Sequence, residues 1–226
     1  MTTVGTVAME LVARALGDLA ENVMFVGGLA GGLLITDPAA PPLRPTDDVD
    51  VVADIAGSFS DELQLSKRLR ALGFTEDDSE GAPRCRWRLR NLKIDVMRAS
   101  DDRWFPDALK HAQTHQIADD VTIRTISLPF FLATKLEAFG DGRRGDYFSS
   151  HDIEDIVAVL DGRAAATAEV GAAPTGVRDF LRQRFRSLLA DLDFVDAVAG
   201  HLPGDSASQA RLPLVLSRMR AIATAP

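Results

Sequence analysis

The sequence has almost no cysteine, no apolar stretch of membrane-spanning length and no excess of basic residues. Its single cysteine, Cys85, excludes a disulfide within the chain and fits a reducing compartment. The first residues lack the basic and apolar regions of a secretory signal, so we expect a cytoplasmic protein with no membrane contact. The net charge of −8 at pH 7 argues against general affinity for nucleic acid, without excluding a local basic groove.

What the sequence does contain is enough apolar material for a real core. Of its 226 residues, 46% are hydrophobic, which suits one large domain or a core with a helical extension. It contains no internal repeat.

A glycine pair interrupts the first strongly apolar segment. Residues 23–26 are apolar, Gly27 and Gly28 follow, and an apolar segment continues to Ile35. This pattern predicts a buried strand that turns into a helix at the glycines. Glycine reaches positive φ without penalty and lets backbone N–H groups approach phosphate oxygens, so we expect both glycines to contact a phosphate.

Three aspartates accompany two further apolar segments. Asp48 and Asp50 alternate with valines in residues 48–52, and Asp95 interrupts the apolar segment 92–97. In a strand, Asp48 and Asp50 would share one face while the valines point into the core. An acidic turn before an ordinary strand is the alternative. Three carboxylates on neighbouring strands would repel one another unless a cation lies between them, which favours a divalent metal site.

The order of these motifs resembles the polymerase-β-like nucleotidyltransferase superfamily. The glycine pair, the Asp48-Val49-Asp50 motif and Asp95 within an apolar strand carry the resemblance. The later segments 127–139 and 150–156 are similar to the AbiEii/AbiGii toxin-type nucleotidyltransferases of abortive-infection and toxin–antitoxin systems. This resemblance implies that Asp48, Asp50 and Asp95 bind Mg²⁺ or Mn²⁺, with Asp95 either completing the metal site or acting as general base.

The resemblance also implies roles for residues elsewhere in the chain. Lys135, in an apolar helix, would reach the nucleotide triphosphate, although such a lysine can instead extend to solvent. Asp152 would belong to the catalytic set and orient Lys135 or the acceptor hydroxyl. Arg44 and Thr46, just before the acidic pair, would bind substrate, while Arg44 could equally be a solvated loop residue.

The expected fold is α/β (α+β): a minimal nucleotidyltransferase core with a mixed sheet of five or six strands flanked by helices, then a helical C-terminal region. We place the core at residues 1–126 and the helical region at 127–226. An amphipathic N-terminal helix has Val7, Leu11, Leu16 and Leu19 among its apolar positions. The alternating basic residues of 84–90 favour an edge strand over a phosphate-binding strand. Residues 163–176 look like a linker.

A basic helix is expected near residues 177–192. Its arginines could receive tRNA or a protein, or could simply be solvated.

The predicted reaction is transfer of a nucleoside monophosphate from an NTP to an acceptor. The toxin-type resemblance implies a tRNA 3′ end or a protein side chain as acceptor, and a toxin with a partner antitoxin. A small-molecule acceptor such as an antibiotic stays open. The alternative is a non-catalytic or partner-regulated nucleotide-binding protein on the same fold, because the long proline-rich loop 37–45 could block productive NTP binding.

Overall fold

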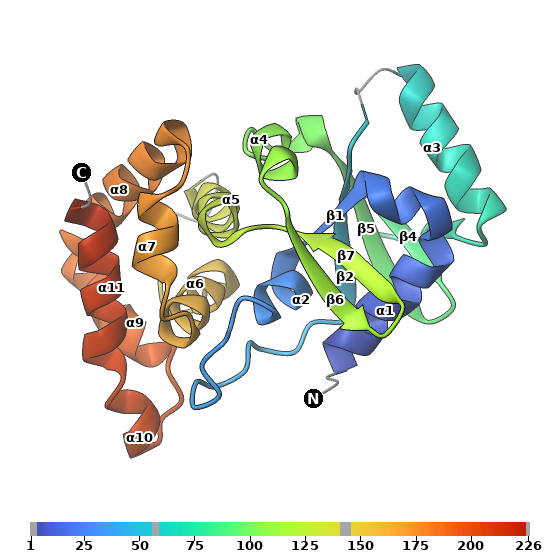
Figure 1. The fold of residues 1–226 in the computed structure, drawn as a ribbon. Helices are drawn as coiled ribbons and strands as arrows, with labels where there is room; N and C mark the ends of the chain where they lie inside the picture. The colour runs from blue at the N-terminus through green and yellow to red at the C-terminus, as the bar shows by residue number, and fades with distance from the viewer. Residues whose placement is uncertain (1–3, 56–58, 141–145, 225–226) are drawn as a thin grey trace. The chain divides into compact units, whose positions relative to one another are not determined.

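The computed structural model describes residues 4–55, 59–140 and 146–224. The chain divides into two compact units (Figure 1). The sheet unit comprises Met1–Ala30 and Pro45–Ser127, and the helical unit comprises Gly31–Arg44 and Leu128–Pro226. The segment Gly31–Arg44 therefore groups with helices that follow much later in the sequence.

Within the described part of the chain, seven strands form one mixed sheet in the order β3-β4-β5-β2-β1-β7-β6. β2 runs parallel to β5 and β1 parallel to β7, while the other neighbouring strands are antiparallel. The mixed sheet is confirmed, with more strands than expected. The strands are β1 Val23–Val26, β2 Asp48–Ala53, β3 Thr75–Glu76, β4 Arg86–Leu89, β5 Leu92–Arg98, β6 Gln113–Ala118 and β7 Val121–Thr125.

The centre of the sheet is apolar because its strands are covered on both faces. All four residues of β1 are buried, as expected for a central strand whose two faces both lack solvent. Phe25, Val51 and Ile94 contribute fully buried side chains from three adjacent strands. The acidic residues of β2 and β5 therefore lie beside a rigid, well-packed framework.

Short helices accompany the sheet. α1 packs against β2, β6 and β7 (Figure 1). It buries Met9, Val12 and Leu16 at helical spacing. Val7 and Leu11, which we expected on the apolar face, are 44% and 41% exposed, so that part of the prediction was wrong. The helices of this region are α1 Val4–Leu16, η1 Gly17–Asn22, α2 Gly27–Gly32, α3 Phe59–Ala71, η2 Ala99–Asp101 and α4 Phe105–Lys110.

The helical unit is built around α5, which is apolar on most of its surface. Eight of the thirteen residues in α5 are buried, including Leu132 and Leu136, and α6, α7 and α8 pack against it. Residues 163–176 are not a linker, because α7 buries Ala166 and Val170 one helical turn apart. The helices are α5 Leu128–Gly140, α6 His151–Gly162, α7 Ala166–Gly171, α8 Thr175–Leu189, α9 Leu192–Gly200, α10 Ser206–Gln209 and α11 Leu212–Thr224.

The proline-rich segment is tied to the end of α6. The backbone N–H groups of Thr36 and Asp37 both donate to the carbonyl of Gly162, and Arg211 on the approach to α11 forms a 2.7 Å ion pair with Asp37. A Cβ atom on Gly162 would lie only 2.6 Å from Ile35, so glycine permits this close approach. The loop is therefore anchored at its start within the helical unit.

Among the described residues, every helix is too short or too polar to cross a bilayer.

Candidate functional site

β2 carries the predicted acidic pair on one face. Val49 and Val51 are buried at 1% and 0% exposure, whereas the intervening Asp48 and Asp50 are only partly buried. This is the period-two alternation of a strand, so the predicted strand and its orientation are confirmed. The alternative of an acidic turn fails, because Asp48 already belongs to the ladder between β2 and β5.

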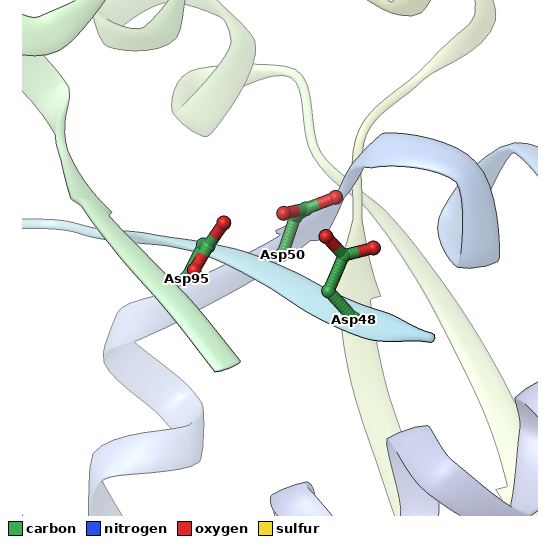
Figure 2. A group of neighbouring side chains, drawn as sticks. All are labelled: Asp48, Asp50 and Asp95. Atoms are coloured by element: carbon green, nitrogen blue, oxygen red, sulfur yellow. The ribbon is translucent and has the colours of Figure 1, made fainter. Parts of the chain in front are cut away.

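Parallel pairing of β2 with β5 brings the third carboxylate to the same place. Asp50 lies directly opposite Asp95 in the register of the two strands. One oxygen from each of Asp48, Asp50 and Asp95 lies within 4.8 Å of the others. Figure 2 shows the three side chains rising from the same side of the two strands. We call these residues the acidic triad.

The donor set of the acidic triad fits a divalent cation. Three partly buried carboxylates at this separation repel one another, and a cation between them removes the repulsion. Carboxylate oxygens are hard ligands, which suit Mg²⁺ and Mn²⁺ rather than softer metals. The sheet supplies the rigidity, since neighbouring hydrogen-bonded strands fix the Cα positions of all three residues.

A guanidinium lies against the triad, which the sequence did not lead us to expect. Arg86 on β4 is the direct neighbour of Asp95 across the β4–β5 ladder. Its Nε and Nη2 atoms each donate to a different oxygen of Asp95 at 2.7 Å, and Nη2 also donates to Asp48 at 3.3 Å. The hydrogen bonds to Asp95 raise the pKa of Arg86 above its ordinary value.

The strand that carries Arg86 is an interior strand. β4 pairs with β5 on one side and with β3 on the other, and Trp87 is only 6% exposed. Among the described residues the outer strands are β3 and β6. The predicted edge strand at 84–90 was therefore wrong: its alternating arginines pair with carboxylates, Arg86 with the triad and Arg88 with Asp77.

Gly27 meets a steric requirement set by the triad. It begins α2 directly after β1, with a φ of +67°. Residues other than glycine rarely adopt this backbone conformation. A Cβ atom at this position would overlap the carboxylate of Asp50. The predicted turn from strand to helix at the glycine pair is confirmed, although α2 ends at Gly32, short of the expected Ile35.

Gly28 and Thr46 lie next to each other near the start of β2. A Cβ atom on Gly28 would come within 3.2 Å of the Thr46 methyl group. The Thr46 hydroxyl donates a short hydrogen bond to the carboxylate of Asp48. Thr46 therefore contacts the triad through Asp48, and its hydrogen bond orients the Asp48 carboxylate.

Lys135 lies in a mixed-charge cluster within the helical unit. Its Nζ atom is 2.7 Å from Asp155 and 3.1 Å from Asp152, both on α6. Burial lowers the pKa of Lys135, but attraction to Asp155 and then Asp152 outweighs burial, so its pKa lies above the ordinary value. Lys135 is 15% exposed and does not extend freely to solvent.

Asp155 links Lys135 to Arg44. Asp155 is fully buried, and its other oxygen lies 3.4 Å from Nε of Arg44. Arg44 also approaches Glu154 at 3.9 Å. Arg44 is thus an ion-paired residue of the helical unit rather than a solvated loop arginine. We call Lys135, Asp152, Asp155, Glu154 and Arg44 the mixed-charge cluster.

A cavity of about 660 Å³ opens beside this cluster within the helical unit. Arg44 and Glu154 contribute to its wall from the cluster. Phe148, at 61% exposure, adds an aromatic surface, and His151 and His201 add imidazole groups. The cavity is large enough for a small organic molecule.

The predicted site residues fall into two groups. Gly27, Gly28, Thr46 and the acidic triad belong to the sheet unit, and Arg44, Lys135 and Asp152 belong to the helical unit. Within each unit the predicted residues are neighbours, although they are spread over many positions in the sequence.

Sequence reasoning missed Arg86 and Asp155. Asp155 had a detectable signal, because it interrupts the buried face of α6 between Ile153 and Ile156, and a carboxylate at a buried position requires a partner. Arg86 had none in the sequence: only the register of β4 against β5 places it opposite Asp95.

The arginines of α8 are engaged within the helical unit. Arg178, Arg184 and Arg186 donate to backbone carbonyls, and Arg182 pairs with Asp179. These contacts give the arginines a structural role and use one or two of the five N–H donors of each guanidinium, so both roles that the sequence left open are compatible with the structure.

Comparison with known proteins adds information about the fold. No protein-family model matches the sequence, and no curated protein is significantly similar to it. Among solved structures, an antigenic nucleotidyltransferase-like protein from Paracoccidioides brasiliensis superimposes with a TM-score of 0.51 at 17% identity, over 87% of this chain and 92% of that one.

A second solved structure agrees. A candidate nucleotidyltransferase from H. pylori superimposes with a TM-score of 0.50 at 11% identity, over 98% of this chain and 96% of that one. The chain has a nucleotidyltransferase-like fold. At these identities the similarity establishes the fold alone, so the chemistry of this protein must be argued from its own residues.

Proposed function

We propose that this protein is a metal-dependent nucleotidyltransferase that moves a nucleoside monophosphate from an NTP to an acceptor nucleophile and releases pyrophosphate. The observation that carries the proposal is the acidic triad, with oxygens of Asp48, Asp50 and Asp95 within 4.8 Å of one another on adjacent strands. Like charges held this close on a rigid sheet favour a cationic ligand. The nucleotidyltransferase-like fold supports the same reading.

Each predicted site residue has a role in this proposal. Asp48 and Asp50 would hold the cation, and Asp95 would complete the metal site or accept the proton of the acceptor. The cation, when bound, would neutralise charge on the phosphate oxygens. Gly27 and Gly28 leave room for Asp50 and Thr46 beside them and would contact the triphosphate through their backbone N–H groups. Thr46 orients Asp48.

The residues of the helical unit complete the assignment. Lys135 would neutralise triphosphate charge, and Asp152 would orient it, since the two already form a 3.1 Å hydrogen bond. Asp155 joins them as the stronger orienting partner at 2.7 Å. Arg44 lines the neighbouring cavity and would contact substrate there.

We further propose a class of acceptor and a protein partner. The resemblance of 127–139 and 150–156 to AbiEii/AbiGii toxin-type enzymes supports a tRNA 3′ end or a protein side chain as acceptor, and an antitoxin as protein partner. The contacts of the α8 arginines with backbone carbonyls use one donor atom of each guanidinium, so an RNA acceptor could still be bound by the remaining donors.

The test is incubation with each α-³²P-labelled NTP and Mg²⁺ or Mn²⁺. Total tRNA, the protein alone and a panel of aminoglycosides serve as separate acceptors. We expect label on one acceptor, lost in the Asp48→Ala/Asp50→Ala variant. Asp77→Ala/Asp78→Ala is the matched control, because these carboxylates lie outside the triad, and it should retain transfer.

A non-catalytic nucleotide-binding protein is the second candidate, and one observation favours it. The guanidinium of Arg86 already places a positive charge against Asp95 and Asp48, where a bound cation would otherwise supply it. This candidate predicts metal-dependent NTP binding by calorimetry without label transfer to any acceptor. Transfer that depends on Asp48 and Asp50 would eliminate it.

A further inference from the structure

Arg86 occupies a defined place in the row of charges across the sheet. Asp50, Asp95 and Arg86 are consecutive cross-strand neighbours on β2, β5 and β4. The Arg86 side chain is 19% exposed, and that of Asp95 is 13% exposed. The ladder therefore fixes an arginine beside the triad on the same side of the sheet.

The contact between Arg86 and Asp95 is a strong form of ion pair. Two parallel N–H donors reach the two oxygens of one carboxylate at 2.7 Å each, and this fork geometry adds both energy and orientation. The third contact, to Asp48 at 3.3 Å, extends the same guanidinium to a second member of the triad.

One guanidinium cannot neutralise three carboxylates, yet it changes the electrostatics for any cation that approaches. A divalent cation on the triad would lie close to the positive charge of Arg86 and would share two carboxylates with it. Like charges held this close in partly solvated surroundings repel one another appreciably. Arg86 and a divalent cation are therefore competitors for Asp95 and Asp48.

We propose that Arg86 is an internal counter-ion of the acidic triad, which stabilises the triad without metal and weakens its affinity for a divalent cation. This inference rests on the proposed function, because it takes the triad as the metal site. Release of Asp95 and Asp48 by Arg86 then accompanies tight metal binding.

The test is a titration of the purified protein with Mn²⁺, in which free Mn²⁺ is followed by electron paramagnetic resonance without nucleotide. Arg86→Gln should bind Mn²⁺ about tenfold more tightly than the unaltered protein, because the competing charge is gone. Arg88→Gln is the matched control: it lies on the same strand, loses the same charge and pairs with Asp77 instead. Its affinity should change by less than about twofold.

One outcome of the Mn²⁺ titration would contradict the proposal. An Arg86→Gln affinity equal to that of Arg88→Gln, or weaker than that of the unaltered protein, removes the proposal. Asp48→Asn/Asp50→Asn separates the two levels of inference. If that variant loses Mn²⁺ while Arg86→Gln is unchanged, only the role of Arg86 fails; if it binds Mn²⁺ normally, the triad is not the metal site and the proposed function fails as well.

Thermal unfolding with and without Mn²⁺ tests the same proposal in case the variants are less stable. Without its counter-ion the triad is more repulsive, so Mn²⁺ should raise the Tm of Arg86→Gln more than it raises the Tm of the unaltered protein. Arg86→Met, which also lacks donors, should behave in the same way. A variant that folds only with Mn²⁺ supports the proposal, whereas equal Tm shifts in all proteins contradict it.

Discussion

The acidic triad of the sheet unit and the mixed-charge cluster of the helical unit differ in the sign of neighbouring charges. In the triad, three carboxylates face one another and one guanidinium serves two of them. In the cluster, Lys135 and Arg44 alternate with carboxylates around the fully buried Asp155. In an alternating arrangement the positive and negative side chains neutralise one another, whereas an arrangement of like charges favours binding of an additional cation.

The two groups of residues therefore differ in whether they require a ligand to balance their charges. The mixed-charge cluster can hold α5 and α6 together without any ligand, so its presence alone is weak support for phosphate binding. The acidic triad has an excess of negative charge that Arg86 balances only in part, so it is the stronger support for the proposed function. Four substitutions or conditions test that distinction.

The largest expected effect is on Asp155, the centre of the alternating cluster. Asp155→Asn would leave Lys135 and Arg44 with an uncharged partner at a fully buried position. We expect the free energy of unfolding to fall by about 3 kcal/mol. Urea unfolding followed by circular dichroism measures it. Asp152→Asn, at a partly exposed position, is the control and should cost about 1 kcal/mol or less; similar losses in both variants would contradict a buried centre.

The second effect concerns the backbone beside the triad. Gly27→Ala places a Cβ atom on the Asp50 carboxylate and demands a φ of +67° from alanine. The expected loss of stability is about 2 kcal/mol. Gly32→Ala, where a Cβ atom meets nothing within 4 Å, should be neutral or slightly stabilising. Combining Gly27→Ala with Asp50→Ala should recover part of the loss, and an absence of recovery would show that φ alone is responsible.

The third test asks whether the mixed-charge cluster also binds a ligand. Lys135→Ala should weaken NTP binding about tenfold if its ammonium group neutralises phosphate charge. Calorimetry with an NTP and Mg²⁺ measures the affinity. Lys110→Ala is the control, because Lys110 is exposed and pairs with Asp107. If Lys135→Ala binds the NTP with unchanged affinity, the role of Lys135 is limited to its ion pairs with α6.

The smallest effect is the pH dependence of the same lysine. The pKa of Lys135 is raised in the folded protein, so its charge stabilises the fold fully below its unfolded pKa of about 10.4 and less as pH rises through the folded value. The stability difference between the unaltered protein and Lys135→Met should therefore shrink between pH 9 and pH 12. Urea unfolding at several pH values measures it, and a difference that grows with pH would reverse the sign.

Periodicity and turn chemistry determined much of this protein by themselves. The valines that alternate with Asp48 and Asp50 fixed the strand and the face of both carboxylates. The start of α6 followed from Ser150, whose hydroxyl accepts from the N–H of Ile153. These features are local, because side-chain spacing along one element decides which face is buried.

Strand register and helix pairing were decided only by the tertiary structure. Nothing in the spacing of residues 84–98 says that Arg86 lies opposite Asp95, since a shift of one residue would reverse every face of the strand. Asp155 meets Arg44 only because the segment Gly31–Arg44 joins the helical unit. Ion pairs between distant segments depend on how elements pack, and a linear pattern of hydrophobic residues specifies burial rather than partners.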